Sequence, residues 1–239
     1  MSKRQELRDK RIRQQRQQRL IIIGMVIIGA LLVAAALIYP SLKPIGDIVT
    51  ITPRTFNAAV DRNTLGDPNA PVKVDVWEDF QCPACASYTQ QIEPLVIANY
   101  VETGKVFYTF HNYAFIDSMV ATKESHQAAS ASLCAADQGR FWDYHDMLYA
   151  NWNGENQGAF SDKRLVAFAE NLGLEMSSFN TCFNQDKYAD EIQQDFTDGQ
   201  QKGVTGTPSV FVNGVQVTPG FVPSYDQLSA IIDAALSGE

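Results

Sequence analysis

Residues 72–85 read VKVDVWEDFQCPAC, and this stretch decides the fold. In its first half, valines at every second position alternate with other residues, which is the period of a β-strand that buries one face. The CPAC segment follows and opens a helix expected from about Pro83 to Tyr100, because proline suits the first helical position. Residues 105–111 (KVFYTFH) are rich in β-branched and aromatic side chains and predict a second strand. Strand, helix and strand in this order predict a parallel pair joined by a right-handed crossover.

The rest of the chain divides into a helical block and a return to the sheet. Apolar residues at helical spacing run through residues 117–202. A hairpin is expected over residues 209–217, where an Asn-Gly pair separates two apolar runs in the manner of a two-residue turn. The last helix begins at Ser224, which forms a capping-box pattern with Gln227. The expected fold class is therefore α/β, with the order β-α-β, a helical block and β-β-α.

The N-terminal region carries a membrane signal. Residues 1–19 hold eight Lys or Arg against two acidic residues, a net charge of +6, and form the predicted basic cytoplasmic N-terminus. Residues 20–39 are apolar and uncharged, and a helix of that length, at about 1.5 Å per residue, matches a hydrocarbon core of about 30 Å. This stretch is the predicted transmembrane anchor. The positive-inside rule then places the N-terminus in the cytoplasm and the bulk of the chain outside.

Two other interpretations of the apolar run remain. A buried core helix is rarely apolar on all faces over such a length. A cleaved signal peptide, with its cleavage site at residues 34–36 (AAA), usually has a shorter charged region. We therefore expect a retained anchor. Residues 40–65, with three prolines and no sustained period, predict a linker, in which residues 48–51 can form a short strand.

The charge balance argues against one class of function. The net charge of the chain is −8, so the residues after position 19 carry −8 − 6 = −14. A domain this acidic has no basic face to displace counterions from phosphates, and we expect no nucleic-acid binding.

Cys82 and Cys85 are the candidate catalytic residues. A thiol at a helix N-terminus faces unpaired backbone N–H groups and the positive end of the helix dipole, both of which favour the thiolate. The CxxC spacing lets the two sulfurs cycle between dithiol and disulfide, with Cys82 as the nucleophile and Cys85 as the resolving thiol. A zinc half-site and a purely structural disulfide are the alternatives, but the sequence offers no second CxxC and no closely spaced pair of histidines. We expect no metal and no cofactor.

Three segments, VWEDFQCPAC, GDPNAPV before it and GVTGTPSVFVNG far downstream, resemble the DsbA-like branch of the thioredoxin superfamily, over about residues 64–238. The resemblance implies a thioredoxin-like fold over residues 66–239 that is interrupted by a helical insertion at about 117–202. It also implies that Thr207 and Pro208 bind substrate, with a cis peptide bond at Pro208 facing the dithiol. X–Pro bonds adopt the cis form at small cost, although an ordinary trans turn proline is the alternative.

Cys134 and Cys182 lie in the helical block. In an exported domain an even cysteine count favours a second disulfide, and two buried free thiols are the alternative. The surrounding sequences are similar to insertion segments of DsbA-like proteins that carry such a bridge. We therefore expect a structural disulfide, which the chain-entropy model values at about 4 kcal/mol for a loop of this length.

The chain departs from the family pattern at one position. Many thioredoxin-fold enzymes carry a buried acid six residues before the first active-site cysteine, and here that residue is Val76. Asp75, Glu78 and Asp79 are the candidates to replace it. The last two also lie close in sequence to Cys82, where their charges disfavour its thiolate and oppose the helix dipole.

These observations predict an extracytoplasmic thiol–disulfide oxidoreductase, held in the cell membrane by a single span, that forms disulfides in exported proteins arriving reduced or unfolded. The resemblance implies a membrane quinone-linked thiol oxidase as the partner that regenerates its disulfide. A disulfide isomerase or reductase of the same fold and a non-catalytic peptide-binding or chaperone module are the alternatives. Isomerases of this superfamily usually carry a separate dimerisation domain before the catalytic core, which the sequence does not suggest.

Overall fold

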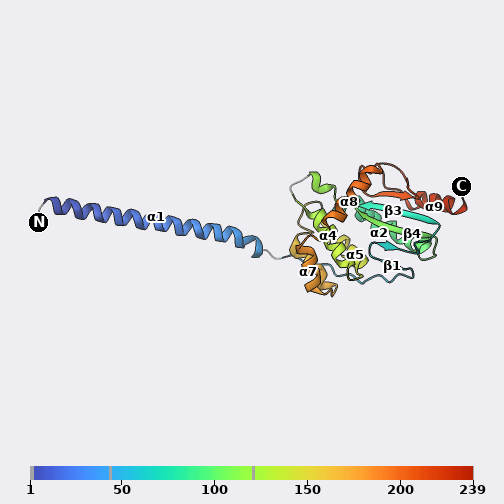
Figure 1. Cartoon of the computed structure of the whole chain (residues 1–239), viewed down its shortest axis with the longest axis horizontal. Coiled ribbons are helices and arrows are strands. Elements are labelled where there is room, and N and C mark those ends of the chain that lie inside the picture. The colour runs from blue at the N-terminus through green and yellow to red at the C-terminus, as the bar shows by residue number, and fades with distance from the viewer. Residues whose placement is uncertain (1–2, 43–44, 120–121, 239) are drawn as a thin grey trace. The chain divides into compact units, whose positions relative to one another are not determined.

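The chain forms two compact units, which Figure 1 colours along the sequence. The computed structural model describes residues 3–42, 45–119 and 122–238. The units are Met1–Gly46 and Asp47–Glu239, and each is described by itself.

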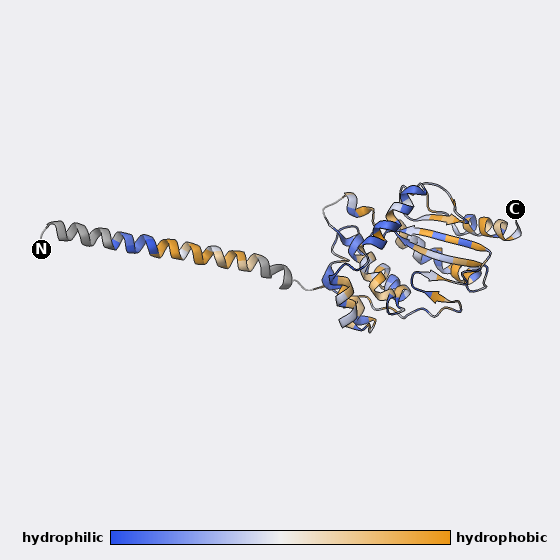
Figure 2. Cartoon of the chain, viewed as in Figure 1, coloured by the Kyte–Doolittle hydropathy of each residue, from blue (hydrophilic) through white to orange (hydrophobic). Residues whose placement is uncertain are grey.

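The first unit consists of helix α1 (Lys3–Leu42). Its stretch Gln15–Ala36 is long and apolar enough to cross a membrane. The large apolar side chains from Leu20 to Val33 are all more than half exposed, and Figure 2 colours most of the ribbon over this stretch as hydrophobic. Soluble domains rarely expose an apolar surface of this extent, so the helix has the properties of a membrane anchor, as the sequence predicts.

A six-stranded sheet forms the centre of the second unit, with the strand order β1-β2-β4-β3-β5-β6. β3 and β4 run parallel, as the strand–helix–strand pattern predicts, and the other neighbouring pairs among these described strands are antiparallel. The predicted hairpin is present as β5 and β6, which pair across the Asn-Gly turn. The strands are β1 (Val60–Asp61), β2 (Thr64–Leu65), β3 (Val72–Glu78), β4 (Val106–Asn112), β5 (Ser209–Val212) and β6 (Val215–Gln216).

The helical connection from β3 to β4 is divided into three pieces, where the sequence predicts one helix over 83–100. They are α2 (Pro83–Gln91), α3 (Glu93–Val96) and the π-helical turn η1 (Ile97–Val101). The division falls at Ile92, whose φ of −115° departs from helical geometry, and Pro94 restarts the helix because it has no N–H to continue the earlier one.

The last helix, α9 (Tyr225–Ser237), begins as predicted. The Ser224 side chain accepts a hydrogen bond from the Gln227 N–H, and the Gln227 side chain accepts one from the Ser224 N–H, which completes the capping box. α9 packs against α3 and β3 and covers part of the core.

The helical block lies between β4 and β5, as predicted. Its central helix is α4, most of whose residues are buried because α5, α6, α7 and α8 all pack against it. The many alanines and serines of α4 let these helices approach closely. The elements are η2 (Ile116–Met119), α4 (Glu124–Ala136), α5 (Phe141–Ala150), α6 (Asp162–Asn171), α7 (Met176–Asn184) and α8 (Ala189–Gln201).

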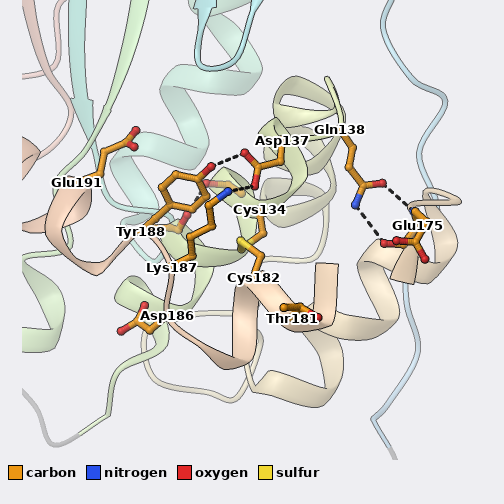
Figure 3. Close-up of a disulfide and its surroundings, with 12 residues drawn as sticks. Cys134, Asp137, Gln138, Glu175, Thr181, Cys182, Asp186, Lys187, Tyr188 and Glu191 are labelled. Atoms are coloured by element: carbon orange, nitrogen blue, oxygen red, sulfur yellow. Dashed lines mark hydrogen bonds and ion pairs between the residues drawn. A yellow bond between two sulfur atoms is a disulfide. The ribbon is translucent and has the colours of Figure 1, made fainter. Parts of the chain in front are cut away.

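A disulfide joins Cys134 of α4 to Cys182 of α7, the pair that the sequence predicts (Figure 3). Beside it, Asp137 accepts hydrogen bonds from Lys187 Nζ, at 2.7 Å, and from the Tyr188 hydroxyl. The bridge and these bonds together hold α7, and the chain that follows it, against the C-terminal end of α4.

The folded unit begins earlier than the sequence predicts. The predicted linker over residues 40–65 is too long, because the second unit starts at residue 47 and both Ile51 and Phe56 pack against its core. Asn151, at the end of α5, binds the N–H of Val49 at 2.8 Å and its carbonyl at 2.9 Å. This described stretch therefore forms no strand. The stretch around Val49 is bound by the Asn151 side chain, which is far away in sequence, and such a contact produces no periodic pattern from which it could be predicted.

On the face of the sheet that carries Trp77 and His111, α8 is held by a charged contact and by close packing. The His111 ring stacks on the Trp77 ring at 4.2 Å, and its two nitrogens contact the carboxylates of Asp75 (3.2 Å) and of Asp195 in α8 (3.0 Å). Burial opposes a charge on this ring, but the two carboxylates outweigh it and raise the pKa of His111 to about 9. Gly199 of α8 lies so close to Trp77 that a Cβ atom there would come within 2.9 Å of the indole ring.

Candidate active site

The two cysteines of the CPAC segment lie just beyond the carboxyl end of β3. Cys82 is the N-cap of α2, and Cys85 lies within its first turn. Because β5 pairs with β3 in antiparallel register, the start of β5 lies beside the end of β3. This register brings the Thr207–Pro208 peptide bond to the dithiol. That bond is cis, as the resemblance implies, and the Cys82 thiol donates to the Thr207 carbonyl at 3.3 Å.

The surroundings of Cys82 favour its thiolate. The strongest influence is a hydrogen bond from the Cys85 thiol, which outweighs the opposing effect of burial. The Thr207 hydroxyl and the backbone N–H groups of Cys85 and Ala84 add to it, and together they lower the pKa of Cys82 to about 6. These N–H groups belong to the first turn of α2, as the sequence argument requires. The Thr207 hydroxyl interacts with both sulfurs of the pair, and it can donate to the Cys82 sulfur once the thiol proton has left.

Cys85 has the opposite character. Burial first, and then the neighbouring Cys82 sulfur and the Glu78 carboxyl, raise the pKa of Cys85 well above its usual range. Cys85 is wholly buried, whereas Cys82 is 6 % exposed. At neutral pH the outer sulfur is therefore a thiolate and the inner one a thiol, which is the difference that a nucleophile and a resolving thiol require.

Glu78 replaces the buried acid that is missing at Val76. Side chains two apart on a strand share a face, so Glu78 lies on the same face of β3 as Val76, one step nearer the cysteines. It is 1 % exposed, and its Oε2 accepts a hydrogen bond from the Tyr149 hydroxyl at 2.8 Å. Burial, and next the charge of Glu93, raise the pKa of Glu78 well above its usual value, which favours the protonated, neutral form of the carboxyl. Asp75 points to the opposite face, where it binds His111.

Asp79 fastens the helical insertion to the loop before Cys82. Its Oδ1 accepts hydrogen bonds from the Gln81 N–H (2.9 Å) and the Ser125 hydroxyl (2.6 Å), and its Oδ2 accepts one from the Ile116 N–H (3.0 Å). Burial raises the pKa of Asp79 to about 7 in spite of these bonds. The expected repulsion of the Cys82 thiolate by Glu78 and Asp79 is therefore outweighed. Burial favours the neutral forms of both acids, and the hydrogen bond from Cys85 and the donors of the helix terminus stabilise the thiolate.

Behind Glu78 lies a second group of buried polar side chains, which the sequence analysis does not identify. Glu93 of α3 pairs with Arg54 Nη1 at 2.9 Å and contacts Nε2 of His145, in α5, at 3.5 Å. Nδ1 of His145 lies 2.9 Å from Asp146. Glu93 and His145 are both wholly buried. The residues adjacent to each in sequence do not indicate its partner, so only the folded structure shows that the two meet.

Known proteins resemble this chain in both sequence and fold. The family model described as thioredoxin matches residues 59–234. The probable disulfide bond formation protein D of Bacillus anthracis is 28 % identical over 177 residues, which cover 73 % of this chain and 78 % of that protein. The structure of oxidised BdbD from Bacillus subtilis matches with a TM-score of 0.65 at 23 % identity, over 81 % of this chain and 100 % of that one. Oxidised Mtb DsbA matches with a TM-score of 0.59 at 27 % identity, over 80 % and 93 % of the two chains.

Proposed function

Because the chain belongs to the thioredoxin family and is a DsbA-like thiol–disulfide oxidoreductase, we propose that it works as an oxidase, which transfers a Cys82–Cys85 disulfide to thiol pairs in exported proteins. The observation that carries this proposal is the opposite ionisation of the two sulfurs, with the pKa of Cys82 lowered to about 6 and that of Cys85 raised. A stable Cys82 thiolate stabilises the dithiol form, and a pair whose dithiol is stabilised tends to oxidise its substrates.

In the first step, a substrate thiolate attacks the Cys82 sulfur of the disulfide. A bond forms between the substrate sulfur and Cys82, the Cys82–Cys85 bond breaks, and its electron pair leaves on Cys85. Because the pKa of Cys85 is well above its usual value, the departing thiolate takes up a proton. The neutral carboxyl of Glu78 interacts with the Cys85 sulfur and is the donor.

In the second step, another substrate thiolate attacks the substrate sulfur of this mixed disulfide. The substrate leaves with its two thiols joined, and the electron pair of the broken bond leaves on Cys82 as a thiolate. Cys82 is the better leaving group of the pair, because its pKa is the lower one.

We assign substrate binding to Thr207 and Pro208. The pairing of β5 with β3 ends at Ser209, so the two preceding residues lie outside that ladder. The Thr207 carbonyl lies 3.3 Å from the Cys82 sulfur, so an extended peptide whose sulfur bonds to Cys82 passes beside this backbone. Such a peptide can add to it through main-chain hydrogen bonds.

We further propose that the domain acts at the outer face of the cell membrane. The length and apolar character of α1 support the anchor, and the basic residues before it favour a cytoplasmic N-terminus. Each turnover leaves the enzyme as a dithiol, so an oxidant must restore the disulfide. The family resemblance supports a membrane quinone-linked thiol oxidase in this role.

The test measures the oxidation of a reduced, unfolded, cysteine-containing protein by the oxidised full chain in detergent. We expect wild type to act stoichiometrically and Cys82→Ser to be inactive. The double variant Cys134→Ala/Cys182→Ala, which removes only the structural bridge, serves as the control and retains activity below its melting temperature. Equal rates for wild type and Cys82→Ser overturn the proposal. Equilibration with glutathione buffers then gives the direction, because a potential well above the thioredoxin value of about −270 mV indicates an oxidase.

A further inference from the structure

Glu78 has no direct path to water. In the proposed oxidation, on which this inference rests, each disulfide transfer removes one proton from Glu78. The side chain is 1 % exposed, so a proton that reaches it from solvent passes through neighbouring groups. Oε2 is bound by the Tyr149 hydroxyl, whereas Oε1 accepts no hydrogen bond from any residue that the structure describes.

Oε2 of Glu93 and Nε2 of His145 are also buried without a hydrogen-bond partner in the part of the chain that the structure describes. They face each other at 3.5 Å. His145 and Tyr149 lie one turn apart on the same side of α5, with ring centroids 5.0 Å apart. One side of α5 thus presents a hydroxyl to Glu78 and, next to it, an imidazole to Glu93.

The other nitrogen of His145 is directed toward the surface. Nδ1 lies 2.9 Å from Oδ1 of Asp146, whose side chain is 17 % exposed. Arg54 binds both carboxylate oxygens of Asp146 at 2.6 Å and also binds Glu93, so it holds the two acids on either side of the imidazole. An imidazole can take a proton at one nitrogen and release one from the other, so its position suits transfer from the surface to the interior.

We propose that His145 and Glu93 form a proton relay that resupplies Glu78 from the protein surface at Asp146. After Cys85 takes the proton of Glu78, Glu93 takes the Nε2 proton of His145 and passes it to the Glu78 carboxylate, while Nδ1 of His145 takes up a proton from water at Asp146. One proton enters for each thiolate protonated, and no electrons move along this route. His145 and Glu93 are positioning residues, since neither touches the reacting sulfurs.

The surroundings of His145 contain few other groups able to take part. Several aromatic rings pack on the imidazole in the described chain and shield it from water, so the neighbouring carboxylates are the groups suited to carry the proton. The titratable or charged groups near the imidazole are Glu93, Asp146, Tyr149, Glu78 and Arg54, and the rings packed on it are those of Phe80, Phe110, Phe141, Trp142 and Tyr149.

The test is a rapid-mixing measurement of the first step, in which oxidised full chain in detergent reacts with a cysteine peptide over a range of pH. His145→Gln keeps hydrogen-bonding groups toward both carboxylates but carries no proton. Glu93→Gln keeps an acceptor for Arg54 and likewise blocks the relay. The matched control is His126→Gln, which removes the imidazole–carboxylate pair that His126 forms with Asp186 at 2.9 Å, elsewhere in the insertion.

We expect both relay variants to react about tenfold more slowly than wild type at pH 8, a smaller factor than a general acid itself contributes. The loss should shrink toward pH 6, where protons are more abundant. The solvent deuterium isotope effect should rise, because proton uptake becomes rate-limiting. The control should match wild type in all three respects.

Three outcomes overturn the relay. The first is that both variants react at the wild-type rate. The second is that the rate falls by the same factor at every pH and the fall correlates with a lowered melting temperature. The third is that the solvent isotope effect does not change. If His145→Gln does not fold, Glu93→Gln decides the question. A wild-type protein that fails to oxidise thiols defeats the proposed function instead, so the two failures are distinguishable.

Discussion

Replacing Cys85 by alanine tests how the Cys82 thiolate is stabilised. The Cys85 thiol is the largest influence among those that lower the pKa of Cys82 from 9.0 to about 6. At pH 7 a pKa of 6 gives about ten thiolates for each thiol, whereas a pKa of 9.0 gives about one for each hundred thiols. Relative to that ordinary thiol, the thiolate stabilises the reduced enzyme at pH 7 by about 1.4 kcal/mol, or about 30 mV in the two-electron potential.

The ultraviolet absorbance of the thiolate, followed against pH in the reduced protein, measures this pKa directly. We expect wild type to titrate near pH 6. In Cys85→Ala the midpoint should move upward but stay below 9.0, because the backbone N–H groups of the first turn of α2 still face the sulfur. The alkylation rate of Cys82 at neutral pH should fall in parallel. A wild-type midpoint near 9, or an unchanged midpoint in Cys85→Ala, would refute this account of the thiolate.

Three further predictions concern the frame around the site. The pKa of His111 is about 9 in the folded protein, above the ordinary 6.5, so the charged ring adds about 3 kcal/mol to the free energy of unfolding below pH 6.5, and this contribution is lost as pH rises through 9. Urea unfolding of wild type at a series of pH values should show this loss. A similar loss in Asp195→Asn would contradict it. Removing both Cys134 and Cys182 should lower the free energy of unfolding by about 4 kcal/mol, from the loop of 48 positions they close, while folded protein keeps its Cys82 alkylation rate. Gly199→Ala gains about 1 kcal/mol of helix propensity but overlaps the packed rings, so we expect a net loss of about 1 kcal/mol or more; a raised urea midpoint would disprove the close packing.

The elements nearest the active site were predictable because their signals are local. The alternation in β3, the proline after Cys82 and the Asn-Gly turn each depend on residues adjacent in sequence, and the structure has them as expected. The capping box at Ser224 belongs to the same class. By contrast, the helix is interrupted at Ile92 because Pro94 lacks the N–H that would continue it, and the spacing of apolar residues does not predict this break.

The position of the buried acid shows where local signals end. The sequence offers three acids near Val76 and does not choose among them. The pleat of β3 makes the choice, because residues two apart share a face, and Glu78 alone of the three lies on the core side near Cys85. Asp75 is turned to His111 by the same alternation.

Long-range polar contacts were beyond the sequence for a different reason. Arg54 lies in a stretch predicted as linker, yet it binds Glu93 and Asp146 on two separate helices. His145 looks like one ring among several in an aromatic helix. Neither residue has a neighbour in sequence that signals its partner, so their meeting depends on how α3, α5 and the N-terminal segment pack together.

The loop before the cysteines limits which segments of this chain can be exchanged for those of another protein. Asp79 binds Ser125 and Ile116, while the Gln81 carbonyl accepts from the Trp152 indole N–H at 2.7 Å. The helical block is thus bonded to the catalytic loop itself and cannot be exchanged as an independent module. A chimera that takes this block from another protein must therefore take the matching loop residues too, because otherwise Asp79 and the Gln81 carbonyl lose the partners described here.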